Sequence, residues 1–223
     1  DLMKNIIGIG ISPFSMNVCA CMVVIFINNQ LVRFGGDMSV GAFGIANRIV
    51  FIFVMFVMGI NQGMQPIAGY NYGAQKLDRM MQVVKLSIIA ATVIMILGWF
   101  LAMLAPRQCV SLFTTDKHLI DTTVHGMRRM MLMLPIVGYQ MVITNFFQCI
   151  GKVKISIFLS LSRQLLFLLP ALALLPIWFG LDGVWLAQPV SDFIASVVTA
   201  WIMIVYMHKF KLQHKENQYG RQE

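Results

Sequence analysis

The stretch "MGINQGMQPIAGYNYGAQKLDRM", residues 58–80, decides how the rest of this sequence is interpreted. A strongly apolar run leads into it, and amides, a proline and a Gly-Tyr-Asn-Tyr-Gly segment follow before a charged sequence begins. Proline removes a backbone donor and glycine relaxes the backbone. We therefore expect Pro66 to stop one helix, residues 69–73 to form a turn, and a second helix to start near Ala74.

The composition of the whole chain points to a bilayer as the solvent of these helices. Of the 223 residues, 58% are hydrophobic and 12% are charged, and the mean hydropathy is +0.76. A soluble domain carries about 25% charged residues. So little polar surface cannot cover so much apolar material in water, and the sequence predicts an all-α, polytopic membrane protein.

Six apolar runs are long enough to cross the roughly 30 Å hydrocarbon core as helices. They occupy about residues 9–31, 38–60, 86–105, 130–150, 155–179 and 183–207. We interpret residues 1–210 as one transmembrane domain and residues 211–223 as a polar, mobile cytoplasmic tail. The longest connector, residues 106–129, is expected to lie at the interface, with Thr114-Thr115-Asp116 capping a short helix whose apolar side carries Leu119, Ile120 and Val124.

The basic residues indicate an orientation. With six spans, both ends of the chain lie on one side, which collects ten basic residues against five on the other. The ten are Lys4, Lys76, Arg79, Lys85, Lys152, Lys154, Lys209, Lys211, Lys215 and Arg221. The positive-inside rule then predicts a cell-membrane protein with both ends in the cytoplasm.

The formal charge of +8 does not indicate a nucleic-acid-binding protein, because the basic residues are scattered between apolar runs. The four cysteines have no CxxC spacing, and no histidine falls inside a predicted span, so we expect no metal site. G-x-S-x-G, HExxH and P-loop motifs are absent from the sequence. We therefore expect neither an enzyme nor a cofactor.

Charged residues inside a membrane are costly and mark candidate functional sites. Arg163 and Asp192 lie on the two arms of a helical hairpin, at depths that differ by about 9 Å, within reach of a long arginine side chain. The pair is either a structural ion pair, or Asp192 takes part in ion or substrate coupling. Arg48, the other charge within a span, either extends to the headgroups or faces a wet cavity.

Uncharged polar residues within the spans are further candidates for lining a cavity. Gln140 and Thr144 share a helix face at i, i+4 spacing. Such residues contact a ligand or form hydrogen bonds between helices, and the sequence leaves both open. The set comprises Asn17, Asn28, Tyr139, Gln140, Thr144 and Asn145.

Several segments together resemble the multidrug and toxic compound extrusion (MATE) transporter family. The match is densest in the Q-G-x-Q-P-I-x-G-Y-N-Y-G-A pattern of residues 62–74, and "FGGDMSVGAFGIANRI", "SLSRQLLFLLP" and "GLDGVWLAQPVSDFIA" support it by their order. The resemblance covers most of residues 5–210. It implies the C-terminal six-helix lobe of a two-lobed, 6+6 transporter, and hence a missing amino-terminal lobe of the same parent chain.

The resemblance also implies a function. MATE transporters export small organic cations by alternating access, in exchange for H⁺ or Na⁺. The carboxylates that hold Na⁺ in some members are missing from the spans at 9–31 and 130–150, which favours H⁺, with Asp192 as the candidate coupling group. A loop or hinge role is implied for Gln65, Pro66, Gly69, Tyr70, Asn71, Tyr72 and Gly73.

Two other functions remain open at this stage. One is a flippase for lipid-linked oligosaccharide from the same wider superfamily, which needs a cavity rich in arginine and lysine. The other is a membrane assembly module without transport activity, or a lone half whose homodimer would rebuild the two-lobe cavity.

Overall fold

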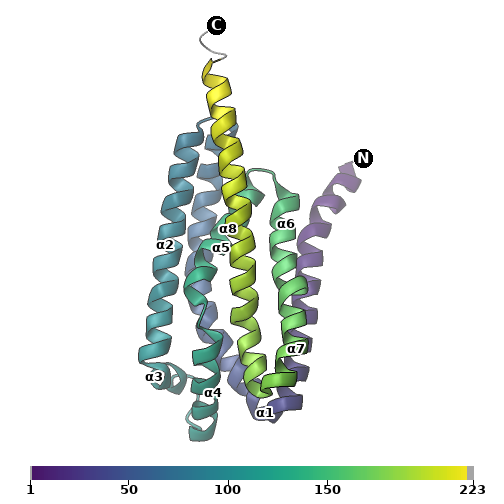
Figure 1. Cartoon of the computed structure of the whole chain (residues 1–223), viewed down its shortest axis with the longest axis vertical. Coiled ribbons are helices and arrows are strands. Elements are labelled where there is room, and N and C mark those ends of the chain that lie inside the picture. Colours follow the sequence, from purple (N-terminus) through teal and green to yellow (C-terminus); the bar gives the residue numbers. More distant parts are fainter. Residues whose placement is uncertain (1, 220–223) are drawn as a thin grey trace.

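The computed structural model describes the backbone of residues 2–219 and the side chains of residues 17–207. Within that range every regular element is helical (Figure 1). The elements are α1 (Leu2–Gly73), α2 (Leu77–Leu104), α3 (Pro106–Ser111), α4 (Lys117–Met130), α5 (Leu134–Cys149), α6 (Val153–Leu161), the π-helical η1 (Ser162–Leu168), α7 (Leu169–Phe179) and α8 (Leu181–Tyr219).

Helix α1 is two arms joined at Gly36. Its φ of 68° and ψ of −177° are not helical, and a positive φ favours glycine because no Cβ is present to clash. The arms on either side run in opposite directions (Figure 1). The break falls between the predicted spans at residues 9–31 and 38–60. Ser39 Oγ donates to the carbonyl of Gly35 at 2.8 Å and ties the bend together.

Pro66 does not stop the second arm, so this expectation was wrong. The helix continues through Gly69, Tyr70, Asn71 and Tyr72 to Gly73, and the chain turns only at residues 74–76, where Gln75 has a φ of 58°. One missing backbone hydrogen bond does not break a membrane helix whose neighbours hold it. Met64 and Ala68, on either side of the proline, are both buried in the core.

The connector at 106–129 contains two helices, α3 and α4, and its expected position at the interface remains a prediction. Helix α4 is bent by 57° relative to α5, and the pair has the length and composition of a broken span or a re-entrant segment. The buried face of α4 packs on α1 and α8. The cap expected within Thr114-Thr115-Asp116 is confirmed at its last residue: Asp116 accepts the His118 backbone N–H at 2.9 Å.

The number of membrane-spanning helices agrees with the predicted fold class. Four helices are long and apolar enough to cross a membrane, and the bent pair α4–α5 makes a fifth if the pair is counted as one span. The break at Gly36 divides the first of these and gives a sixth. The all-α, polytopic fold is thereby confirmed, while the proposed domain boundaries remain predictions.

Helix α8 runs on as a helix to Tyr219, into the segment that we expected to be a mobile tail. Residues 220–223 lie outside the described part of the chain. The N-terminal turn of α1 and the C-terminal half of α8 lie at the same end of the bundle, as an even number of spans requires (Figure 1).

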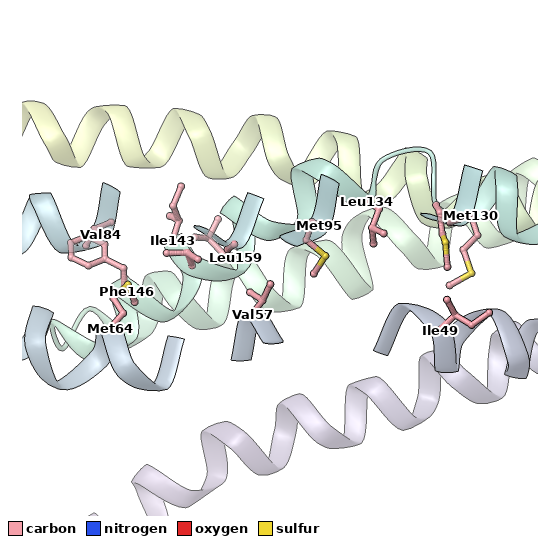
Figure 2. Packing of buried hydrophobic residues seen from close by; sticks show 14 of the residues in the cluster. Ile49, Val57, Met64, Val84, Met95, Met130, Leu134, Ile143, Phe146 and Leu159 are labelled. Atoms are coloured by element: carbon pink, nitrogen blue, oxygen red, sulfur yellow. The ribbon is translucent and has the colours of Figure 1, made fainter. Parts of the chain in front are cut away.

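The main core lies between the second arm of α1, α2, α5 and α8. Ile49, Val57, Met95 and Phe146 are among its buried side chains (Figure 2). Large apolar side chains also cover the outside: Ile25, Phe56 and Leu97 are each about 60% exposed in the isolated lobe. Such a surface is stable in hydrocarbon, so we expect hydrogen bonds and close packing to hold the helices together in the bilayer.

Glycine lets helix α4 pack closely against α8. A Cβ atom at Gly126 would lie 2.2 Å from the ring of Trp185, which is 1% exposed and packs on Phe43. Small residues at such crossings let membrane helices pack closely.

Gly126→Ala should therefore lower the free energy of unfolding by about 1–3 kcal/mol, since the Trp185 ring must move out of a packed site. Thermal unfolding in lipid nanodiscs measures this effect. Gly44→Ala is the matched control, because a Cβ there meets no atom within 4 Å. Equal melting temperatures for Gly126→Ala and Gly44→Ala would contradict the packing account.

Candidate functional site

Arg163 and Asp192 face each other inside the bundle. Arg163 Nη1 lies 3.4 Å from Asp192 Oδ1, and the side chains are 29% and 7% exposed. Ser191 Oγ donates to the Arg163 backbone carbonyl at 2.9 Å, so the two backbones lie at the same level. The predicted pair is present, but the expected difference in depth was wrong.

The local geometry of the helix that carries Arg163 contributes to the discrepancy between the expected and the observed depth. Residues Ser162–Leu168 form a π-helical turn, and Pro170 and Pro176 follow it in α7. The expected depth assumed a straight α-helix, whereas a π turn bonds i to i+5 and prolines bend a helix. π turns occur often at functional sites, and this one carries both Arg163 and Gln164.

The ion pair lies on the wall of a pocket of about 420 Å³. The second arm of α1, α5, the α6–η1 segment and α8 contribute its walls. The polar lining comprises Asn47, Gln140, Thr144, Asn145, Ser160, Arg163, Gln164, Gln188 and Asp192. The apolar lining comprises Val50, Phe51, Val54, Met58, Met130, Leu134, Val137, Met141 and Leu159.

Five of the residues singled out in the sequence meet at this pocket: Gln140, Thr144, Asn145, Arg163 and Asp192. Asn145 Oδ1 accepts a hydrogen bond of 3.2 Å from Gln65 Nε2, which ties α5 to the second arm of α1. Gln65 thus has a structural contact beside the pocket. The hinge role proposed for its segment remains a prediction.

The other candidates lie elsewhere. The Tyr139 hydroxyl donates to the Ser196 carbonyl at 2.8 Å and joins α5 to α8. Asn17 and Arg48 lie on the exposed surface of the lobe, and Asn28 is half-buried on the first arm of α1. None of the four lines the pocket.

Sequence reasoning missed Gln164, Gln188, Asn47 and Ser160 as pocket residues. Helical spacing could have indicated Gln188 as a pocket residue, because it precedes Asp192 by four residues and so shares its helix face. Gln164 carried no such signal, since the π turn decides which way it points.

A separate cluster of charges lies at the opposite end of the bundle from the chain ends. Arg129 Nη1 lies 2.6 Å from Asp182 Oδ1, and His125 Nε2 lies 3.2 Å from the same oxygen. Arg129 and His125 also contact each other. These contacts fix α4 to the start of α8, while Arg107 and Asp121 form an exposed pair at 2.7 Å.

Side chains 17–207 contain no group of three or more His, Cys, Asp or Glu residues placed to hold a metal ion. The lining of the pocket contains one carboxylate, one guanidinium, several amides and an apolar wall.

Comparison with known proteins identifies the family. A family model described as MatE matches residues 11–172. The chain belongs to the MatE family. The resemblance seen in the sequence is thereby confirmed.

Curated relatives in this family are about twice as long. The multidrug export protein MepA of Staphylococcus aureus (strain MSSA476) is 24% identical over 212 residues, which are 95% of this chain and 46% of MepA. MepA of Staphylococcus haemolyticus is 26% identical over 201 residues, 88% of this chain and 44% of that protein. The chain thus spans about half the length of the curated relatives that it matches.

Solved structures show the same fold. The MATE multidrug transporter DinF-BH, solved as a complex, is 39% identical with a TM-score of 0.76, over 87% of this chain and 44% of that one. A MATE crystal structure in the bent conformation gives a TM-score of 0.86 at 20% identity, over 96% of this chain and 47% of that one.

Arg163→Ala should destabilise this MatE chain by about 3–5 kcal/mol, because Asp192 would stay buried without its ionic partner. The double variant Arg163→Ala/Asp192→Ala should recover most of the loss, since it removes the orphaned charge. Unfolding in nanodiscs measures both. A double variant no more stable than Arg163→Ala would show that the pair is not what stabilises this region.

Proposed function

We propose that this chain forms one lobe of a two-lobed exporter that moves organic cations out of the cell in exchange for an inward-moving cation. The observation that carries the proposal is the Asp192 carboxylate on the wall of an apolar pocket inside the helix bundle. Ionisable groups at membrane depth are expensive and mark transport pathways. A concave, mostly apolar pocket with few polar groups is also the usual form of a small-molecule site.

The pocket lining supports organic cations as the substrate class. Asp192 supplies negative charge, and Val54, Val137 and Leu159 offer apolar surface to the body of the ligand. Met58, Met130 and Met141 also line the pocket. Methionine is flexible and polarisable, so such a wall can adapt to ligands of several shapes.

The second lobe is part of the proposal. The relatives named multidrug export protein MepA are about twice the length of this chain, which covers 46% of the S. aureus protein. A six-helix partner lobe would close the open side of the pocket, and rocking of the two lobes would expose it to each side in turn. The excess of basic residues beside both chain ends supports a cytoplasmic position for these ends.

We favour H⁺ over Na⁺ as the coupling ion. Asp192 is the candidate H⁺ carrier within this lobe. Arg163 lies beside it as a cation that competes with H⁺ for the carboxylate. In this account the chain acts by binding and conformational change and performs no covalent chemistry.

Ethidium export tests the proposal. The two-lobed transporter that contains this chain is reconstituted in proteoliposomes, and a pH gradient and a sodium gradient are imposed separately. We expect export driven by the pH gradient, and a reduction of at least about tenfold in Asp192→Asn at equal folded yield, since ionisable groups at membrane depth mark ion pathways.

Normal export by Arg163→Ala/Asp192→Ala would rule out a coupling role for Asp192. Export driven by the sodium gradient alone would identify Na⁺, and not H⁺, as the coupling ion. Absence of flux under both gradients, with well-folded protein, would contradict the exporter proposal and point to a lipid-linked substrate.

A further inference from the structure

Three residues that line the pocket each hold a buried side-chain oxygen that accepts no hydrogen bond from the described part of the chain. These oxygens are Gln140 Oε1 from α5, Gln164 Oε1 from η1 and Asp192 Oδ1 from α8. Gln140 is only 3% exposed and Asp192 only 5%. All three belong to residues that line the same pocket, although they come from three different elements.

The neighbouring guanidinium does not satisfy Asp192. Arg163 Nη1 is close enough to Asp192 Oδ1 for an ion pair at 3.4 Å, but the contact is not aligned as a hydrogen bond. Arg163 therefore balances charge, and Gln188 forms a hydrogen bond with the Asp192 carboxyl group, but Oδ1 itself is left without a donor. The residues that line the pocket thus hold three acceptor oxygens without donors, one of them on a carboxylate.

A buried acceptor without a donor is unfavourable, and a hydrogen bond to a charged group is among the stronger ones in proteins. A ligand that brings several N–H groups can relieve this cost at more than one of the three oxygens. A quaternary ammonium has no N–H to donate.

The apolar lining supports the same distinction. Proteins recognise quaternary ammonium ions by surrounding them with aromatic rings. Phe51 is the one aromatic side chain in the described pocket lining, so no aromatic cage is present there.

We infer that this pocket selects cations with several N–H donors, such as primary ammonium and amidinium compounds, over quaternary ammonium compounds of the same shape. This inference rests on the proposed function, because it specifies the substrate class of that same pocket. Gln140 and Gln164 determine this selectivity, whereas Asp192 supplies charge to either kind of cation.

A matched pair of ligands tests the selectivity by equilibrium binding to the chain in lipid nanodiscs. The pair is 4-phenylbutylammonium and its N,N,N-trimethyl analogue, which carry the same single charge on the same hydrocarbon body. We expect the primary ammonium to bind at least about tenfold more tightly, since one charge-assisted hydrogen bond corresponds to about that factor.

Three methionine variants locate the effect. Gln140→Met and Gln164→Met remove an acceptor at similar side-chain length, and each should reduce the affinity ratio of the two ligands by about threefold to tenfold. Gln30→Met is the matched control, because Gln30 Oε1 is also buried without a partner but its residue does not line the pocket. The ratio should be unchanged in this control.

Asp192→Asn gives a complementary result. It keeps an oxygen acceptor and removes the charge, so both ligands should bind more weakly while their affinity ratio changes less than in the glutamine variants. Equal wild-type affinities, no binding of either ligand, or an unchanged ratio in both glutamine variants would overturn the inference.

Sodium is the other cation that three oxygen ligands could attract. Displacement of 4-phenylbutylammonium by sodium chloride, but not by potassium chloride at the same ionic strength, would assign the oxygens to a metal ion and overturn the inference. Ethidium export is measured separately. Export without selectivity would refute this inference alone, whereas selective binding without export would refute the proposed function.

Discussion

The burial of one carboxylate in an apolar helix bundle is the constraint on which the pocket depends. Asp192 on α8 is compensated by Arg163 on η1, and Ser191 holds the backbone of that arm at the same level. Helix α5 forms the facing wall and is itself tied to α1 through Gln65 and Asn145. Polar contacts between helices thus lie beside this charged pocket wall, while large apolar side chains cover much of the outer surface.

Close packing supplies the rest of the stability. In hydrocarbon, apolar side chains gain little by leaving the solvent, so van der Waals contact and hydrogen bonds hold helices together. Gly126 under Trp185 and Gly98 beside Phe53 are places where the absence of a side chain permits such contact. Helix α4 packs on α1 and α8, and the Arg129–Asp182 pair fixes its C-terminal end to α8.

Long apolar runs made the fold predictable, because only helices satisfy the backbone across a bilayer. Where a helix ends was less predictable, because tertiary packing carries α1 past Pro66 to Gly73. Within the pocket, Arg163, Asp192, Gln140, Thr144 and Asn145 were found from the cost of polar groups in lipid. Gln164 was not, since its direction depends on a π turn that leaves no pattern in the sequence.

Photoaffinity labelling of the two-lobed transporter with azido-ethidium, mapped by mass spectrometry, tests the central claim most directly. The account predicts labels on pocket residues of α5 and the second arm of α1, such as Met141 and Met58, and their loss when unlabelled ethidium competes. Competable labels confined to other surfaces of this lobe, or to the partner lobe, would contradict the claim that this pocket receives the cation.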